Sequence, residues 1–585
     1  MLNNKNFDLA NEPDGAALFV LSAWHELFHG FTPDSYQPRL HNVPSLVEEL
    51  VSISELWAHS PHLKVHSQQI QKELENAIGN ESDLLAKLPR YRTQCQSLVK
   101  SSTPNECICG GKILIGMADK YWSCFVEHAK DSISGLPASK TDALKNIRRL
   151  ATFAFQNGKE DDDVWLPFKD CERQSASSLF DRMIKMTNER DKSYMVTLAV
   201  IGDPSVTQSI SRSRGFIAVS PRSLSRTYLN KVDSPNEKTL YIQQRKKSVS
   251  IRRAVSEARK DVEFVIGLVS LYQNPDAGIR IHSAALVSLN ASDRTIVQSE
   301  QAFRRLLPRR DASQQIKDVS QRLSSGSVDT RLMATIEQLA LAAASSDSRT
   351  RFINLWAALE TLAGAYEGAN TMSKVCGVLV PLIVSRHVHR TTRYLTILLN
   401  KYKDANKITS LGPGFSKRRG RLRKIQQDEL LITLASREKS AAISGLLAAV
   451  KQPLLRWKVN ECWNVFNNPK SLLKRLKQSQ QSLEWHLSRI YRARNMLVHE
   501  GVETPHTTPL LDNLQHYLST LVQRLIHELE TEPDWSIRQV VEYWNARKNH
   551  LFVELQEGDG SSMLTDDFLE QIKHPKPVWP CNKES

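Results

Sequence analysis

Apolar residues recur every three to four positions along much of the chain, the spacing that places them on one face of an α-helix. In the first part of the sequence this pattern covers residues 16–28, 44–57, 70–88 and 144–155. Polar residues follow, with an acidic run at 160–163. The pattern therefore predicts a helical N-terminal region over residues 1–155.

The middle of the chain has a different pattern. Segments rich in Val, Ile, Leu and Tyr are bounded by Gly, Pro, Asn or Asp, which is typical of strands. These segments are residues 193–201, 215–220, 239–243 and 279–290, with a helical pattern at 251–272 before the last one. We expect a small α+β domain over residues 190–300.

From residue 312 onward the helical pattern returns. It is strongest at residues 334–344, 349–362, 375–387, 393–402, 483–498 and 510–529. A chain of 585 residues is too long for one hydrophobic core. We therefore expect a mainly α, multi-domain protein with a C-terminal helical domain at 312–530, followed by a C-terminal helix and polar tail at 531–585.

Positive charge is concentrated in one stretch. The net charge is +15, and residues 371–480 alone hold 22 Lys and Arg against 5 Asp and Glu. A solvated basic loop is one interpretation, but this concentration favours a polyanion partner, because cations that neutralise phosphates gain affinity from counterion release. The peak of the stretch gives the candidate RNA-binding residues Lys417, Arg418, Arg419, Arg421, Arg423 and Lys424.

Two histidines lie among these basic residues. His387 and His389 alternate with Arg386 and Arg390, and Arg393 follows. We interpret them as part of the same basic surface.

Several classes of protein are disfavoured. No apolar run approaches the roughly 20 residues that span a bilayer, and the first residues do not resemble a secretory signal. The eight cysteines are scattered and predict no disulfide framework. We find no Gly-rich phosphate-binding loop ending in Lys-Ser or Lys-Thr. The expectation is a cytoplasmic protein without a membrane partner.

The chemistry is concentrated at the end of one predicted helix, which Gly501 closes. Asn495 and His499 are four residues apart and share a face, whereas Arg494 and His499 are offset by about 140° and ~7.5 Å in an α-helix. A histidine that exchanges protons near neutral pH, beside an arginine that holds a phosphoryl group, suits RNA cleavage by the RNA's own 2′-hydroxyl. The alternative is a histidine that closes the helix, with Arg494 in a surface ion pair.

Three features in order resemble a known family. The Arg494-Asn495-x-x-x-His499 segment is similar to the Arg-x4–6-His motif of the HEPN superfamily, and the Trp-x-x-Leu-Glu core of residues 351–363 resembles an early helix of its ApeA-like branch. The helix at 510–529 matches the closing helix of the domain. The resemblance covers residues 330–530, with 401–477 as an insertion.

The resemblance implies a metal-independent endoribonuclease without a cofactor. Such proteins are usually homodimers and often act in antiphage defence or as abortive-infection toxins, so an activating ligand or phage component is expected. Arg494 and His499 correspond to the catalytic pair, Asn495 to their support, and Glu360 to an acid that orients Arg494. Gly501 occupies the position where one toxin branch has a Tyr, which argues against that branch.

Other interpretations remain open. An inactive HEPN fold would be a nucleic-acid-binding or protein-interaction scaffold. His25 and His29, with Glu26 between them, match the His-Glu-x-x-His pattern of zinc hydrolases. Cys107 and Cys109 are either buried free thiols or ligands of a structural zinc.

Overall fold

The structure is a computed structural model, and it describes most of the chain in segments. The described residues are 15–28, 42–134, 140–159, 174–189, 191–202, 215–232, 239–272, 279–289, 294–298, 329–345, 347–401, 425–501, 507–532 and 534–557, with Val164 and Phe168. The protein is mainly helical and has a five-stranded antiparallel sheet in the middle of the sequence. The chain forms two compact units: unit 1 comprises Met1–Thr152, Cys171–Asp181 and Arg305–Ser585, and unit 2 comprises Phe153–Asp170 and Arg182–Arg304.

Unit 2 is built on the sheet, in the order β2-β3-β1-β4-β5. All neighbouring strands are antiparallel, and Leu198 in the central strand lies opposite Ile242 on one side and Ala285 on the other. The strands are β1 (Lys192–Ile201), β2 (Ile217–Ala218), β3 (Thr239–Ser248), β4 (Arg280–Ser288) and β5 (Arg294–Gln298). The predicted strand at 215–220 is shorter than expected, the one at 239–243 continues to Ser248, and β5 was not predicted.

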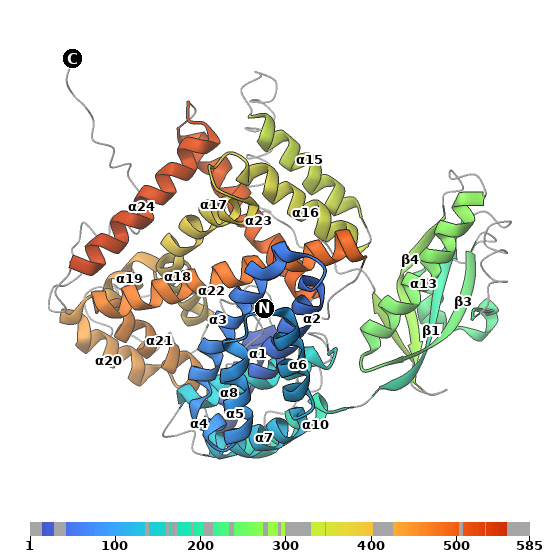
Figure 1. Ribbon diagram of the computed structural model, residues 1–585, viewed down its shortest axis with the longest axis horizontal. Coiled ribbons are helices and arrows are strands. Elements are labelled where there is room, and N and C mark those ends of the chain that lie inside the picture. Colours follow the sequence, from blue (N-terminus) through green and yellow to red (C-terminus); the bar gives the residue numbers. More distant parts are fainter. Residues whose placement is uncertain are drawn as a thin grey trace, which may run out of the picture. The chain divides into compact units, whose positions relative to one another are not determined.

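Helices cover both faces of this sheet. Val196 and Leu198 of β1 pack with Val255 and Val262 of α13 (Ile251–Tyr272), which lies along one face (Figure 1). On the other face are η5 (Pro221–Ser223) and α12 (Arg226–Lys231). Tyr228 of α12 is buried there, and its hydroxyl donates to backbone carbonyls of β1 and β4 at 3.4 and 3.3 Å. Side chains alternate between the two faces along β1, as the period of a strand requires.

The first half of unit 1 is a set of helices in which α2 packs against α3 and α6. Prolines and polar caps define several starts; for example, Thr103 and Glu106 form a capping box before α6. Buried Glu81 joins the set, because it accepts hydrogen bonds from Tyr121 at 2.6 Å and from the amide of Val43 at 3.3 Å. The elements are α1 (Gly15–Phe28), α2 (Val43–Trp57), η3 (Pro61–Leu63), α3 (Lys64–Asn80), α4 (Ser82–Ala86), α5 (Pro89–Val99), α6 (Pro104–Ile115), α7 (Ala118–Ser134), α8 (Lys140–Gln156) and α10 (Ala176–Thr187). The last residues of α8 and α10 belong to unit 2.

The second half of unit 1 surrounds the long helix α22, which contacts α16, α17, α21, α23 and α24. Most predicted helices of this region are present with bounds close to those expected. The elements are α15 (Thr330–Ala344), α16 (Ser348–Ala363), α17 (Thr371–Ser385), α18 (His387–Lys401), α19 (Gln427–Ala435), η7 (Arg437–Lys439), α20 (Ser440–Ala449), α21 (Pro453–Phe466), α22 (Pro469–Asn495), the π-helical turn η8 (Met496–Glu500), α23 (Thr507–Thr531) and α24 (Ile537–Glu557).

The N-terminal helices pack on the C-terminal half of the sequence within unit 1. Helix α1 packs on α21, and α3 packs on α22 (Figure 1). Buried Glu26 of α1 forms an ion pair with Lys458 of α21 and accepts a hydrogen bond from the hydroxyl of Tyr394 at 2.7 Å. The N-terminal helices are therefore part of the same packed unit as the C-terminal ones.

Among the described helices, none is by itself both long and apolar enough to cross a lipid bilayer. Helices α17 and α18 meet the length and composition criteria only as a pair, with a bend of 48° between them.

A glycine in α6 permits its close packing on α2. A Cβ atom at Gly111 would overlap Cγ2 of Val51, a buried side chain with little rotamer freedom. We predict that Gly111→Ala destabilises unit 1 by about 1–3 kcal/mol, the usual cost of overpacking a core. The matched control is Gly79→Ala in α3, where no atom lies within 4 Å of the added Cβ. Calorimetry should give a lower melting temperature for Gly111→Ala only, and equal melting temperatures would contradict the packing described.

Candidate active site

Helix α22 carries the predicted catalytic segment at its C-terminal end. It begins after Asn468, whose side chain accepts from the amide of Ser471 at 3.0 Å, and Pro469 occupies its first turn. Between Leu483 and Ala493 almost every side chain is buried or half-buried, so the helix has neighbours on all sides. Charged groups in such a helix require partners from other elements.

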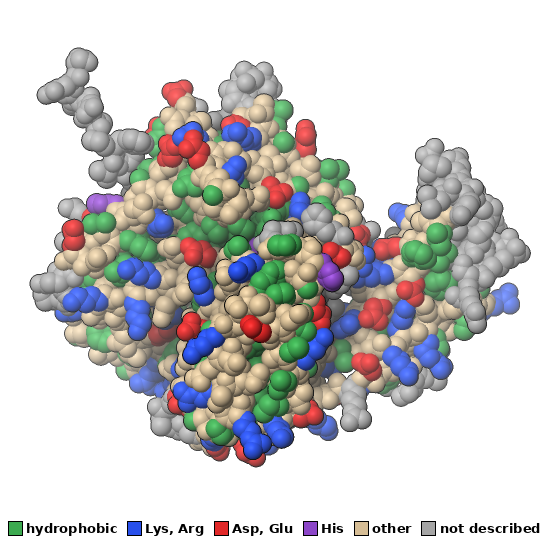
Figure 2. Space-filling model, in the orientation of Figure 1, with side chains coloured by type: hydrophobic (Ala, Val, Ile, Leu, Met, Phe, Trp, Pro, Cys, Tyr) green, Lys and Arg blue, Asp and Glu red, His purple; other side chains and the backbone are tan. Residues whose placement is uncertain are grey.

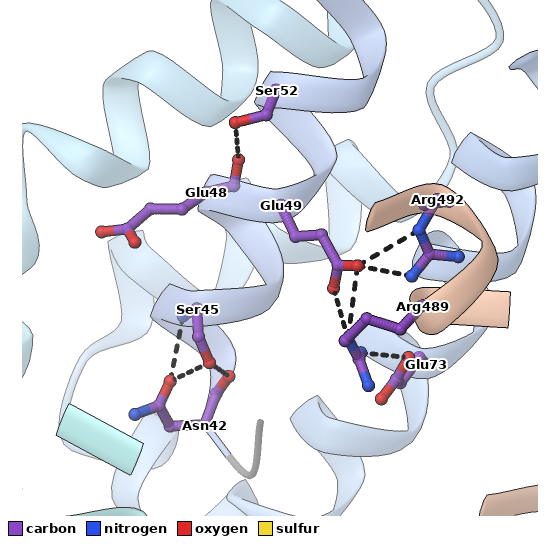
Figure 3. A network of polar contacts seen from close by, with 8 residues as sticks. All are labelled: Asn42, Ser45, Glu48, Glu49, Ser52, Glu73, Arg489 and Arg492. Carbon is purple, nitrogen blue, oxygen red and sulfur yellow. Dashed lines mark hydrogen bonds and ion pairs between the residues drawn. The ribbon is translucent and has the colours of Figure 1, made fainter. Parts of the chain in front are cut away.

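Two arginines of α22 find these partners in the N-terminal helices (Figure 3). The Nε of Arg489 donates to Glu49 of α2 at 3.0 Å, and its Nη2 donates to Glu73 of α3 at 2.8 Å. Arg492, one turn later, donates its Nε to the same Glu49 at 3.2 Å. We call these four residues the Glu49–Arg489 network. It connects α22 to α2 and α3 through charge-assisted hydrogen bonds.

The charges within this network perturb each other strongly. Burial alone would raise the pKa of Glu49, but Arg489 and Arg492 overcome it and lower that pKa from 4.5 to about 2. Burial raises the pKa of Glu73, because Arg489 compensates it only in part. Glu49 is therefore the carboxylate that holds the two arginines as ions.

Aromatic contacts reinforce the same junction. The ring of Tyr491 lies between His66 of α3 and Trp356 of α16, with centroid distances of 5.5 Å to each. On another side of α22, buried His486 contacts the hydroxyl of Tyr517 of α23 at 2.8 Å. Tyr491 and His486 thus fix α22 against both the N-terminal helices and the early and closing helices of the C-terminal set.

Arg494 lies two residues beyond this junction and is less buried. Its Nη2 is 3.8 Å from a carboxylate oxygen of Glu360 in α16, and its Nη1 donates to Oδ1 of Asn495 at 3.1 Å. The Nε–H of Arg494 is buried and has no hydrogen-bond partner within the described residues. The Arg494 side chain is 24% exposed, against 5% for Arg489. The structure thus brings together three of the four predicted catalytic residues.

The turn after Arg494 departs from the expected helix. Residues Met496–Glu500 form a π-helical turn, in which the amide of Gly501 donates to the carbonyl of Met496, five residues earlier. Because such a turn is wider than an α-helical one, positions five apart come closer to a common face. The expected 140° offset between Arg494 and His499 is therefore too large. Gly501 ends the turn with a φ of 64°, so the prediction that it closes the helix is confirmed.

Some predicted site residues lie outside what the structure describes. The backbone of His499 belongs to the π-helical turn, but its side chain is outside the described part. The basic run at 417–424, with all six candidate RNA-binding residues, is also outside the described residues.

The zinc hypothesis at α1 gains no support from the described residues. His25 is buried and Glu26 is ion-paired with Lys458, while His29 lies outside the described part. Glu49 of α2, an acid that could otherwise serve as a third ligand to zinc, is held by two arginines. Among the described residues no three His, Cys, Asp or Glu side chains are grouped as a metal site requires.

The cysteines are free where they are described. Cys107 is buried, and burial raises its pKa, which fits the prediction of a buried thiol. Cys109, two residues later on α6, is exposed, so the same prediction is wrong for it. Two residues along a helix turn a side chain to a different face, which explains the difference.

His387 and His389, interpreted from the sequence as part of the basic surface, lie in α18 beside Arg386 and Arg390. Both are half-buried. Burial, with Arg390 and Arg475 nearby, lowers the pKa of His387 to about 3. Burial, with Arg386 and Arg393 nearby, also lowers the pKa of His389.

The comparisons with known proteins add no assignment. No protein-family model, no curated protein and no solved structure matches the chain.

Removing the central carboxylate should destabilise unit 1. In Glu49→Gln, Arg489 and Arg492 keep their charges but lose their shared partner, and breaking a buried ion pair costs about 3–5 kcal/mol. The pKa of Glu49 is lowered on folding, so its contribution is present above pH 4.5 and is lost as the pH falls toward 2. Urea unfolding should therefore show a large deficit at pH 7 that narrows below pH 4.5.

Glu48→Gln is the matched control, since Glu48 is the exposed neighbour of Glu49 in α2. It should change the unfolding free energy by less than about 0.5 kcal/mol. A Glu49→Gln deficit that is small, or that does not depend on pH between 7 and 3, would refute the role given to Glu49.

Proposed function

We propose that α15–α24 include a HEPN-type domain that cleaves RNA without a metal ion. The observation that carries this proposal is the setting of Arg494. Its guanidinium is held by Glu360 and Asn495, keeps a buried Nε–H without a partner among the described residues, and precedes a π-helical turn that contains His499. An arginine oriented in this way, yet partly exposed, is suited to binding a phosphodiester.

The arrangement of helices supports the same proposal. The early helix α16, the helix α22 and the closing helix α23 contact one another, and α16 also contacts the π-helical turn. The segment between α18 and α22 contributes α19, α20 and α21, which pack against each other and against α18. These helices, like the first residues of α22, fall within the insertion expected at 401–477.

The chemistry requires few groups. The 2′-oxygen of a ribose attacks the adjacent phosphorus, the bond from phosphorus to the 5′-oxygen breaks, and a cyclic phosphate and a 5′-hydroxyl result. His499 transfers the proton that leaves the 2′-hydroxyl or the one that the 5′-oxygen gains. Arg494 binds the phosphoryl oxygens and stabilises their charge in the transition state. In this scheme Asn495 and Glu360 are positioning residues, because they act through Arg494.

The wider role follows from the family resemblance alone. We expect a cytoplasmic homodimer formed through the helical domain, acting in antiviral defence or abortive infection. An activating ligand or phage component would control it. An inactive scaffold is the competing function, and it predicts RNA binding without cleavage.

We predict that the purified protein cleaves RNA in the presence of EDTA, and that Arg494→Ala and His499→Ala each lower the rate by at least about 100-fold, as loss of a general acid–base group does. His527→Ala and Arg90→Ala, which remove an exposed histidine and an exposed arginine elsewhere in unit 1, are the controls. Growth arrest on overexpression should follow the same order. Cleavage that persists in both site variants, or that chelation abolishes, would exclude this site.

The orienting role of Glu360 can be tested separately. Glu360→Gln keeps the size of the side chain but removes the charge that holds Arg494, so we expect kcat to fall about 10–100-fold with KM little changed. Glu360→Asp should recover part of the loss. Glu367→Gln is the control, because Glu367 pairs with Arg538 on the surface. A loss of stability in Glu360→Gln with unchanged kcat would leave Glu360 as a structural residue.

A further inference from the structure

Arginines from several helices converge where α17 ends. One immediately follows α17, two lie in α18, one in α23 and one in α24. Helix α17 packs against α24 and α23, which brings these elements together. The charges of the other four arginines all act on Arg386. We call the five the arginine cluster: Arg386, Arg390, Arg393, Arg524 and Arg547.

Two acidic side chains among the described residues act on this cluster or its edge. Glu528 is 2.6 Å from Nη2 of Arg524 and also accepts from the indole of Trp544 at 3.4 Å. Asp428 acts on His389 at the edge of the cluster. Among the described residues, the guanidinium groups of Arg386 and Arg393 have no hydrogen-bond or ion-pair partner.

Burial and the neighbouring positive charges lower the pKa of two arginines of the cluster. Burial, together with the charge of Arg524 and the other arginines, lowers the pKa of Arg386 to about 10. Burial also lowers the pKa of Arg547, and Arg524 adds to the effect. Like charges held together in a partly desolvated place destabilise the fold unless an anion compensates them. Guanidinium groups bind phosphate through paired N–H donors, so phosphate is the anion that this geometry suits.

The cluster is separate from the candidate active site. Arg524 lies 17 residues after Thr507, the first residue of α23, which corresponds to roughly 25 Å along that helix. The π-helical turn with His499 precedes the start of α23. In Figure 1, α18 and α24 lie on the left, whereas α16 and the end of α22 lie on the right. Figure 2 shows acidic and basic side chains interspersed over α3 to α5.

We propose that the arginine cluster is a second phosphate site, which binds the backbone of the RNA that Arg494 and His499 cleave. This inference rests on the proposed function for the identity of the ligand. A single strand that occupies both sites extends over several nucleotides. The cluster therefore favours long RNA over short oligonucleotides and gives affinity without base specificity.

The test measures binding of a labelled single-stranded RNA by fluorescence anisotropy, in the full chain carrying His499→Ala so that the RNA stays intact. Adding Arg386→Ala and Arg393→Ala should weaken binding at least about 10-fold. It should also reduce the slope of log affinity against log salt by about 1.4, the value for two phosphate contacts to a single strand. The variant should melt no lower than its parent, because it loses repulsion. Arg90→Ala with Arg92→Ala, two exposed arginines of α5, is the charge-matched control and should bind like the parent.

Each outcome decides one point. Equal affinity and salt slope in the cluster variant, or no RNA binding by its parent, would overturn the second site. A parent stabilised by ATP through Arg386 and Arg393, with RNA affinity unaffected, would reassign the site to a free nucleotide and overturn the RNA proposal. RNA binding that depends on the cluster, without cleavage by the wild-type chain, would retain this site and refute the proposed function. Cleavage by the wild-type chain, with unaltered RNA binding in the cluster variant, would retain the proposed function and refute the second site.

Discussion

The buried interaction between Arg489 and the carboxylates of Glu49 and Glu73 determines how unit 1 is arranged. The segment of α22 from Leu483 to Ala493 has neighbours on all sides and still carries Arg489 and Arg492, so it cannot be stable without acids from elsewhere. These acids come from α2 and α3, more than 400 residues earlier in the sequence. Because Arg492 shares Glu49 and precedes Arg494 by two residues, the N-terminal helices also define the position of the candidate site.

Such a network contributes more to specificity of packing than to net stability. The cost of desolvating the four charged groups offsets much of their attraction, whereas a misplaced helix would leave a buried charge without a partner. A displacement of α2 or α3 must therefore either move Arg489 with it or break the network. Tyr491, between His66 and Trp356, couples the same helices to α16, which carries Glu360. The N-terminal helices thus pack, through these side chains, against α16, which carries Glu360, and against the end of α22, which carries Arg492 just before Arg494.

The sequence predicts the elements better than their partners. The apolar period places helices at 349–362 and 510–529 within two or three residues of α16 and α23, because packing and periodicity agree there. It places the start of α22 near residue 483 rather than Pro469, because the polar Lys-Gln-Ser run before 483 hides the period. Glu360 beside Arg494 was expected from the family resemblance. The Glu49–Arg489 pair was not expected, since nothing local marks two residues 440 apart as neighbours. The available signal was that Arg489 and Arg492 lie within the apolar period of the helix predicted at 483–498.

The balance of charge around each arginine distinguishes structural from candidate ligand-binding arginines more clearly than its position in the sequence does. Arg489 is 5% exposed and faces two carboxylates. Its positive charge is therefore compensated within the protein, and a ligand from solvent cannot reach its guanidinium group. Arg494 is 24% exposed and faces one carboxylate at 3.8 Å. At this distance Glu360 orients the guanidinium group more than it neutralises its charge. In the arginine cluster Glu528 pairs with Arg524, and burial together with the charges of the other four arginines lowers the pKa of Arg386 to about 10. A fold gains nothing from such repulsion by itself, and a bound polyanion removes it. The residues with uncompensated positive charge, rather than the most numerous basic residues, are therefore where a phosphate ligand changes the free energy most.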